Sequence, residues 1–256
     1  MIPVGDRLRA HGTPYVNWTL IAVNLAVFIY TITLSTRPDQ LLGGFRTSEI
    51  DRFFYDWGFV SSCIGEFFGL DPDVNPRILN AICPPGDREA IQPLTAMFLH
   101  AGWAHILGNM LFLWIFGDNV EGAMGHGRYL VFYLACGLVA AAAQTAVTLD
   151  ATVPAIGASG AIAGVLGAYL IMFPRALVQV VIIPFFFLPF FVPAVVLIGV
   201  WVITQVFSGI AEMGRETVGE GVAWWAHVGG FTAGAVLITF FRRQDRGHGS
   251  PREQPG

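Results

Sequence analysis

The sequence predicts an all-α membrane protein, a polytopic bundle of six transmembrane helices, from its composition and its apolar runs. Hydrophobic residues make up 54% of the 256 residues and charged residues 12%, whereas soluble domains carry about 25% charged residues. Apolar runs of about 20 residues, long enough to cross a bilayer, recur along the chain. This composition excludes an ordinary soluble domain. The net charge of −4, without a basic patch, gives no sign of nucleic-acid binding.

Six runs meet the length of a membrane span. They are residues 16–34, 98–117, 128–148, 156–173, 186–207 and 222–241. We expect residues 16–241 to form one domain with a cytoplasmic N-terminal segment, 1–15, before it. A tail, 242–256, follows and is expected to be cytoplasmic and disordered, because it is rich in Gly, Pro and charged residues.

Two regions depart from plain membrane spans. The long first loop, 35–97, contains RFFYDWGFVSSCIGEFFG, a pattern typical of amphipathic helices at a membrane interface. The fifth region opens with IIPFFFLPFFVP, in which Pro184, Pro189 and Pro193 each remove a helix hydrogen bond. We therefore expect this opening to be an interfacial or re-entrant segment rather than a straight helix.

Arginines in the short loops orient the predicted helices. They occur before span one, after spans two and four, and in the tail, whereas the loop 149–155 carries none. The positive-inside rule then places both termini in the cytoplasm and the long first loop outside. Short loops and six spans favour a bacterial inner-membrane protein. Cys63 and Cys83 share the outer loop, and a disulfide between them depends on an oxidising compartment, which the sequence leaves open.

Four of the polar side chains in spans two, four and six are candidates for a shared site. His105 and Asn109 are spaced i, i+4 in span two, so they share one helix face. Ser159 lies in span four and His227 in span six. Both of these spans carry stripes of glycine, which allow helix backbones to approach closely. The stripes consist of Gly157, Gly160, Gly164 and Gly167 in span four, and of Gly230 and Gly234 in span six.

The predicted topology brings three of these polar groups to one depth. Spans two, four and six all run from outside to inside, and His105, Ser159 and His227 each lie a few residues past the start of their span. At 1.5 Å per residue they sit roughly 5–12 Å below the outer surface. Polar or ionisable groups in a span cost up to about 2.5–3.5 kcal/mol, so they normally face the protein interior. A Ser and a His in contact there would form a nucleophile–base pair.

Each of these residues also has an ordinary structural interpretation. A lone Ser in a membrane helix usually packs or hydrogen-bonds locally, and a lone His is commonly a core group or lines a pore. A metal site at His100, His105 and His227 is disfavoured, because the sequence has no HExxH motif and no carboxylate at that depth. We expect no metal and no cofactor.

The remaining polar residues near the spans are expected to serve structure. We expect His100 near the surface, where it would hold loop structure. Glu121 is expected to pin the cytoplasmic end of span two. Asn24, Gln144 and Gln205 are expected to be local hydrogen-bonding partners.

Several separate motifs together resemble the rhomboid family of intramembrane serine proteases. They are HAGWAHILGNM in span two, GDNVEGAMGHGR after it, GASG at the start of span four and AHVGG in span six. The resemblance covers about residues 93–241 and implies a six-helix rhomboid core. It also implies that the chain is an intramembrane serine endopeptidase that cleaves transmembrane segments of membrane proteins near the extracytoplasmic side.

The resemblance assigns a role to each of the four polar residues. Ser159 would be the nucleophile and His227 the general base, in a dyad without an Asp. Asn109 and His105 would form the oxyanion hole with the Ser159 backbone N–H. Many members carry an aromatic residue on the catalytic imidazole where this chain has Ala163, so another ring or helix packing must orient His227.

Two other functions remain open on the sequence. One is a catalytically silent rhomboid-like chaperone or scaffold that binds client transmembrane helices. The other is a small transporter, which the sequence disfavours because it has no paired, interrupted helices in corresponding halves. The expected partners are transmembrane substrates and the lipid bilayer. The substrate, the cleavage site and the oligomeric state are left open.

Overall fold

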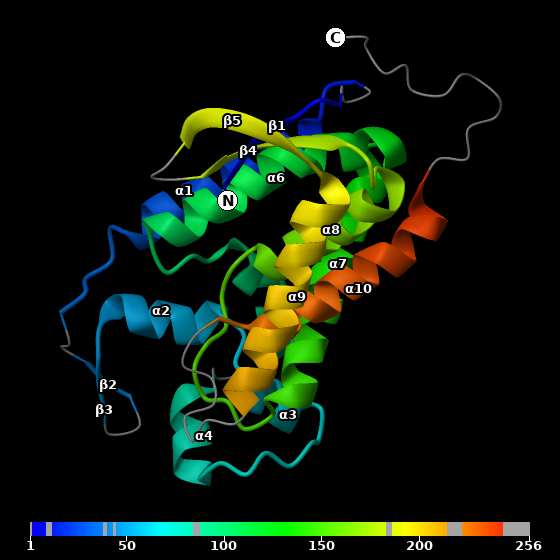
Figure 1. Cartoon of the computed structure of the whole chain (residues 1–256). Helices are drawn as coiled ribbons and strands as arrows, with labels where there is room; N and C mark the ends of the chain where they lie inside the picture. The colour runs from blue at the N-terminus through cyan, green and yellow to red at the C-terminus, as the bar shows by residue number, and fades with distance from the viewer. Residues whose placement is uncertain are drawn as a thin grey trace.

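A computed structural model describes residues 2–8, 12–37, 40–42, 45–83, 88–182, 186–213 and 222–242. The protein is mostly helical, and six apolar helices overlap the six predicted spans (Figure 1). These helices are α1 (Tyr15–Thr31), α6 (Trp103–Met124), α7 (His126–Val147), α8 (Ser159–Met172), α9 (Ala194–Met213) and α10 (Trp224–Phe241). The tail predicted to be disordered lies, from residue 243 onward, outside the described residues.

The helices differ in whether their length alone would cross a bilayer. In the described part of the chain α7, α9 and α10 are long and apolar enough, and α6 adds a fourth when it is joined to the bent segment 92–98 before it. Helices α1 and α8 are shorter, with 17 and 14 residues. Three or four candidate spans are therefore established, and the full count of six stays a prediction.

The prediction of an all-α fold is wrong in one respect. A three-stranded antiparallel sheet covers one end of the helix bundle (Figure 1). The strands are β1 (Ile2–Asp6), β4 (Leu177–Ile182) and β5 (Phe186–Pro193), in the order β1-β4-β5. The fifth span, predicted from residue 186, therefore begins as a helix only at Ala194. Proline explains the difference, since Pro189 and Pro193 disfavour a helix but are tolerated in β5, an edge strand. The expectation that this opening is not a straight helix is confirmed.

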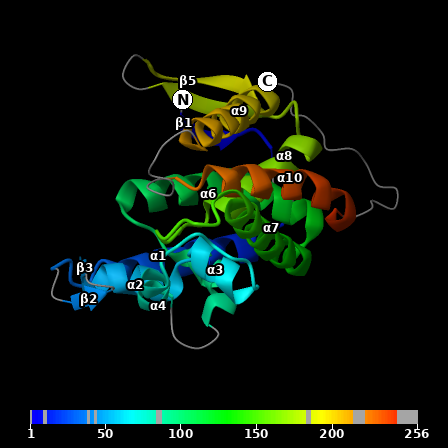
Figure 2. The same cartoon turned by 90° about the horizontal axis from the view of Figure 1, so that it is seen from below.

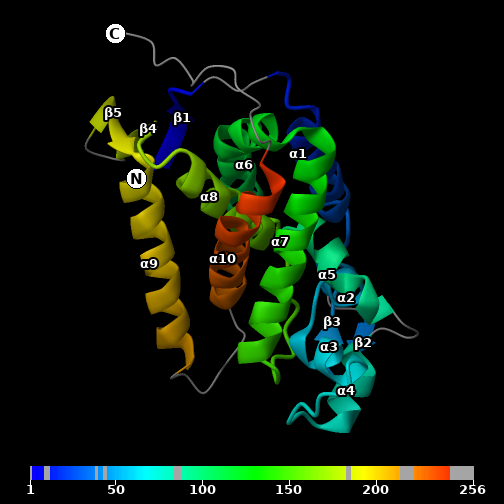
Figure 3. The same cartoon turned by 90° about the vertical axis from the view of Figure 1, so that its right-hand side faces the viewer.

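The long first loop folds into short elements at the opposite end of the bundle from the sheet (Figure 3). They are β2 (Gln40–Leu42), β3 (Phe45–Thr47), α2 (Glu49–Trp57), α3 (Ser61–Phe67), α4 (Pro76–Ile82), η1 (Arg88–Ala90), α5 (Gln92–Thr95) and η2 (Ala96–Phe98). Helix α2 starts with a capping box, in which the Ser48 side chain accepts from the Asp51 backbone N–H and Asp51 accepts from the Ser48 N–H. The helices predicted in this loop are confirmed, and their place at a membrane interface stays a prediction.

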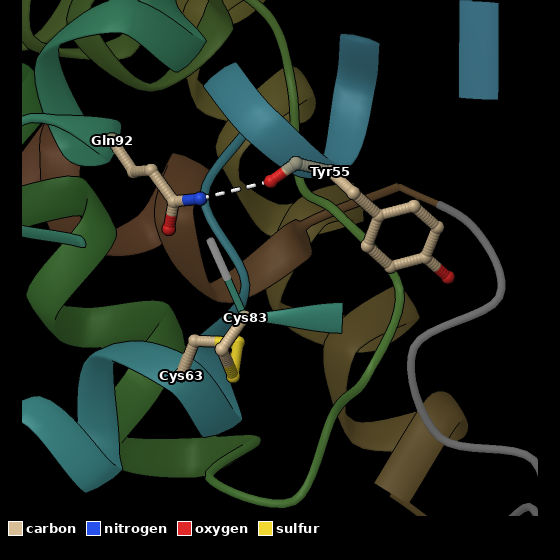
Figure 4. The surroundings of a disulfide bond; sticks show 4 residues. All are labelled: Tyr55, Cys63, Cys83 and Gln92. Carbon is tan, nitrogen blue, oxygen red and sulfur yellow. Dashed lines mark hydrogen bonds between the residues drawn. A yellow bond between two sulfur atoms is a disulfide. The ribbon is translucent and has the colours of Figure 1, made fainter. Parts of the chain in front are cut away.

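Two links hold these elements together (Figure 4). Cys63 on α3 and Cys83 after α4 form the disulfide that the sequence left open. Gln92 on α5 donates a hydrogen bond of 2.9 Å to the backbone carbonyl of Tyr55 on α2. These links join α3 to the segment after α4, and α5 to α2.

We expect Cys63→Ser to lower the free energy of unfolding by about 3 kcal/mol, because the disulfide closes a loop of 20 residues and so restricts the unfolded chain. Chemical unfolding in detergent micelles measures this. A reductant should destabilise the wild type by the same amount as the substitution does. The Cys63→Ser variant is the matched control, and a reductant should leave its stability unchanged. Wild-type stability that is indifferent to reductant would contradict the prediction.

Buried polar contacts join α1 to α6 and α7 near the sheet. The Glu121 carboxylate accepts hydrogen bonds from the backbone N–H groups of Val16, at 3.0 Å, and Asn17, at 2.7 Å, in the first turn of α1. The His126 imidazole hydrogen-bonds the same carboxylate. A carboxylate at a helix N-terminus satisfies free N–H groups and complements the helix dipole. The expectation that Glu121 pins this end of α6 is confirmed.

Helices α8 and α10 pack backbone against backbone through glycine. A Cβ atom built on Gly234 would lie 1.9 Å from the carbonyl oxygen of Gly164, and one on Gly230 would lie 2.0 Å from the carbonyl oxygen of Gly160. Any side chain at these positions would separate the helices. This glycine seam, formed by Gly160, Gly164, Gly230 and Gly234, sets the distance between α8 and α10. Figures 2 and 3 both show α10 between α9 and α7.

Candidate active site

The glycine seam brings Ser159 and His227 into contact. Ser159 is the first residue of α8, and His227 lies in the first turn of α10. The Nε2 atom of His227 lies 2.8 Å from the Ser159 Oγ, within hydrogen-bonding distance. His227 is 7% exposed. A buried imidazole on a serine hydroxyl is an arrangement that can remove the hydroxyl proton.

The other imidazole nitrogen of His227 contacts α9. Its Nδ1 atom lies 2.7 Å from the Oε1 atom of Gln205, which is 5% exposed. The Trp201 ring, one turn earlier on α9, lies 5.8 Å from the imidazole at an interplanar angle of 35°, and Trp224 approaches it edge-on. Sequence reasoning treated Gln205 as a local partner and missed this contact. The available signal was the i, i+4 spacing of Trp201 and Gln205, which puts an aromatic ring and an amide on one face of α9.

His105 and Asn109 on α6 approach the same point from the opposite side. A Cβ atom built on Gly157 would lie 2.7 Å from the His105 Nε2 and 3.7 Å from the Asn109 Nδ2. The Asn109 Nδ2 is buried and has no hydrogen-bond partner among the described residues. A buried amide group without a partner is costly, so it calls for a functional explanation. Asn109 therefore offers a free donor next to Ser159.

A single cavity of about 810 Å³ connects the four polar residues. Ser159, His227, His105 and Asn109 all line it. Further lining comes from β3 and α2, from α6, from the loop 153–156, from α8 and α9, and from the segment that precedes α10. These residues include Thr47, Asp51, Phe54, Tyr55, Gly108, Phe112, Pro154, Ile162, Leu166, Trp201 and Val222. The cavity walls are largely apolar with a small number of polar groups, which is typical of a binding site.

Helix α2 contributes polar groups to the cavity from outside the spans. Asp51 and the Tyr55 phenol line it. Burial, and to a smaller extent the nearby Asp51 carboxylate, raises the pKa of Tyr55 above its ordinary value. A tyrosine phenol is protonated at neutral pH, so Tyr55 can donate a hydrogen bond.

The family follows from a comparison of the whole sequence. A family model described as the Rhomboid domain matches residues 87–244, which include α6 to α10 and all four polar residues. The chain belongs to the rhomboid family.

Three similar rhomboids illustrate the range of relatives. Rhomboid protease GluP of Bacillus subtilis is 46% identical over 77 residues, 30% of this chain and 15% of that protein. Putative rhomboid protease YdcA of the same organism is 37% identical over 79 residues, 31% of this chain and 39% of that protein. RHOMBOID-like protein 6, mitochondrial, of Arabidopsis thaliana is 39% identical over 172 residues, 64% of this chain and 55% of that protein. The chain thus spans about half or less of the length of these relatives.

In this rhomboid, two residues lie elsewhere than the sequence predicts. Gly157 is not part of the α8 stripe, because α8 begins only at Ser159. It lies in the preceding turn with φ of 128°, a conformation that favours glycine. His100, expected near the surface, is buried at 1% exposure with its ring 4.9 Å from that of His105. The expectation assumed a helix from residue 98, whereas α6 begins at Trp103 and the segment before it turns inward.

The histidines of the site do not assemble a metal centre in the described part of the chain. No three side chains of the kinds that bind metals lie close enough there to hold an ion.

Ala163, where the family resemblance implies an aromatic ring, is fully buried. Trp201 of α9 supplies the ring beside the imidazole in this rhomboid.

Proposed function

We propose that the protein is an intramembrane serine endopeptidase that cleaves transmembrane segments of membrane-protein substrates near the extracytoplasmic side. The observation that carries the proposal is the 2.8 Å contact between Ser159 Oγ and His227 Nε2 on the wall of a cavity. The rhomboid family, whose relatives include proteins named as proteases, supports it.

In the proposed reaction, Ser159 is the nucleophile and His227 the general base. A substrate helix must partly unwind, since a helix keeps its carbonyls in backbone hydrogen bonds. The His227 Nε2 takes the Ser159 proton while Oγ bonds to the scissile carbonyl carbon. The tetrahedral intermediate then breaks its C–N bond, and the leaving amine takes the proton from His227. Water, deprotonated by His227, hydrolyses the acyl-enzyme and frees Ser159.

The negative charge of the intermediate needs donors placed beforehand. The Asn109 Nδ2 is such a donor, because it is buried with no partner in the described part of the chain and Asn109 lines the same cavity as Ser159. The Ser159 backbone N–H is a second one, since the first N–H groups of a helix have no partner inside the helix. His105 faces the Gly157 turn and completes this wall.

The proposal includes a topology. Six helices cross a membrane, which we infer to be a bacterial inner membrane, with both termini in the cytoplasm and the disulfide-linked loop outside. Ser159 and His227 lie in the first turns of α8 and α10, so this orientation puts them at a shallow depth below the outer surface. Water for hydrolysis then enters from the outer side.

The test uses the full-length protein in liposomes with a tagged single-span substrate and, separately, a fluorophosphonate probe. We expect a cut near the outer end of the substrate span and covalent labelling of Ser159, located by mass spectrometry. A protein that resists the probe, leaves the substrate intact and co-purifies with it would be a scaffold for client helices and would refute the protease proposal.

We expect Asn109→Ala to lower kcat about 100- to 1,000-fold with little change in KM, because the donor stabilises charge that develops only in the transition state. Asn24→Ala is the matched control. Asn24 is also a buried asparagine in an apolar helix, but its amide donates to the Leu20 carbonyl, away from the cavity. Equal kcat values for Asn109→Ala and wild type would remove Asn109 from the oxyanion hole.

A further inference from the structure

The hydrogen bonds of Gln205 determine which of its side-chain atoms faces His227. Its Nε2 atom donates to the backbone carbonyl of Trp201 at 3.1 Å and to the Thr204 Oγ1 at 3.2 Å. A carbonyl oxygen only accepts, so the amide nitrogen must lie on this side. The amide oxygen Oε1 therefore faces the His227 Nδ1, at 2.7 Å.

This orientation fixes the tautomer of His227. The amide Oε1 of Gln205 can only accept a hydrogen bond, so the Nδ1 of His227 must carry the proton. In the neutral imidazole, Nε2 then has a free lone pair, and this atom faces the Ser159 Oγ. The opposite tautomer would place a proton on Nε2 and could not accept one from Ser159.

Gln205 is also one of few anchors for its part of α9. The buried residues of α9 are Ala194, Leu197, Ile198, Gln205 and Gly209, so after Ile198 only two positions are buried, one turn apart. Gly209 lies against α10, where an added Cβ would come within 3.1 Å of the Trp225 ring and 3.3 Å of the Trp224 Cβ. Figure 3 shows α9 at the edge of the bundle. The position of α9 and the contact between Gln205 and His227 therefore depend on each other.

We propose that Gln205 is a positioning residue that holds His227 in its base tautomer, so that His227 accepts a proton from Ser159 only while α9 is packed against α10. This inference rests on the proposed protease function. Gln205 thereby takes the place of the acid in a Ser-His-Asp triad with a neutral acceptor. It also accounts for the orientation of the imidazole in a chain that has Ala163 where the family resemblance implies an aromatic ring.

The first test compares two substitutions of Gln205 that keep its length. Gln205→Met removes the acceptor, and we expect kcat and the rate of fluorophosphonate labelling to fall about 100-fold with KM unchanged, as for a misplaced catalytic group. Gln205→Glu keeps an acceptor, and we expect both values to stay within about 10-fold of wild type. Wild-type kcat in Gln205→Met, or equal losses in both variants, would overturn the proposal.

The second test pushes α9 away from α10 without touching Gln205. Gly209→Val adds bulk against Trp224 and Trp225, whereas Gly199→Val is the matched control on the same helix, since a Cβ at Gly199 meets nothing within 4 Å. We expect Gly209→Val to lower kcat about 10-fold or more and Gly199→Val to leave it unchanged. Equal kcat values in the two variants would overturn the dependence on α9.

A third measurement separates this inference from the protease proposal. In protein with ¹⁵N-labelled histidine, the signals lost in His227→Ala identify this imidazole. We expect a neutral ring with its proton on Nδ1 in the wild type, and a mixture of tautomers in Gln205→Met. The tautomer can be read even if the protein cleaves nothing, so inactivity alone would refute only the protease proposal. A proton on Nε2 in the wild type would refute the role of Gln205.

Discussion

Ser159→Ala and His227→Ala are each expected to abolish cleavage of a single-span substrate, with a loss of about 10⁴-fold or more in kcat. The first variant has no nucleophile, and the second leaves a serine hydroxyl whose proton has no acceptor at 2.8 Å. The measurement is the initial rate of product formation in liposomes. Because the two residues act as one unit, the double variant should be no slower than either single variant.

The matched control for the loss of the hydroxyl is Ser62→Ala. Ser62 is a fully buried serine on α3, outside the cavity, and its replacement should leave the rate unchanged. Thermal unfolding of all variants in detergent shows whether a loss of rate reflects chemistry or a loss of fold. A folded Ser159→Ala or His227→Ala protein that still cuts at the wild-type rate would rule out the dyad.

Gly234→Ala is expected to destabilise the protein by about 3 kcal/mol or more and to abolish cleavage, since a new Cβ would lie 1.9 Å from the Gly164 carbonyl oxygen. Both sides of this contact are backbone, so neither can yield by rotating a side chain. Helix α10 must then move away from α8, and His227, two turns earlier on α10, moves with it. The midpoint of thermal unfolding in detergent and the cleavage rate measure the two effects.

The control for this substitution is Gly199→Ala, where the added Cβ meets nothing within 4 Å. Alanine is favoured over glycine inside a helix by about 0.5–1 kcal/mol, so this variant should be neutral or slightly more stable. Opposite signs in the two variants would isolate the contact between α8 and α10. If Gly234→Ala were as stable and as active as Gly199→Ala, close backbone packing would not be what holds the dyad together.

Helices with strong apolar runs were predictable, and their ends depended on tertiary partners. Helix α7 spans His126–Val147 against a predicted 128–148. Helix α6 extends to Met124, beyond the predicted end at residue 117, although Asn119 and Glu121 interrupt the apolar run. These side chains find partners inside the protein, Asp6 of β1 for Asn119 and the start of α1 for Glu121. A prediction from hydropathy treats these side chains as if they faced lipid, so it places the end of the helix too early.

The sheet could not be predicted in the same way. Residues 177–193 are apolar except for Gln179, and an apolar run does not distinguish a buried strand from part of a membrane span. The partner strand β1 lies at the other end of the sequence, and it pairs with β4 from Ile2 opposite Val181. The prolines indicated only where a helix would fail. Pairing of distant strands therefore had to come from the structure.

Only a partial signal for the contact between Gln205 and His227 was present in the sequence, the i, i+4 spacing of Trp201 and Gln205. Motifs pointed to Ser159 and His227, because their residue types and spacing carry the chemistry. Gln205 meets the imidazole only through the rotation of α9 about its own axis, which depends on packing at Gly209 and not on the local sequence. Ala163 gave a further hint, since it implied that another ring or helix packing had to orient His227.

The pairing of β1 with β4 also sets an order of events during biosynthesis. β1 leaves the ribosome before its hydrogen-bonding partner, Leu177–Ile182, which follows only after the intervening residues 7–176 have been made. At about 5–20 residues per second, that interval is roughly 10–35 s. Throughout it, the β1 segment lacks the strand that it pairs with in the folded protein. A nascent chain arrested before residue 177 should therefore keep residues 2–6 open to protease, whereas one arrested after the sheet has emerged should protect them.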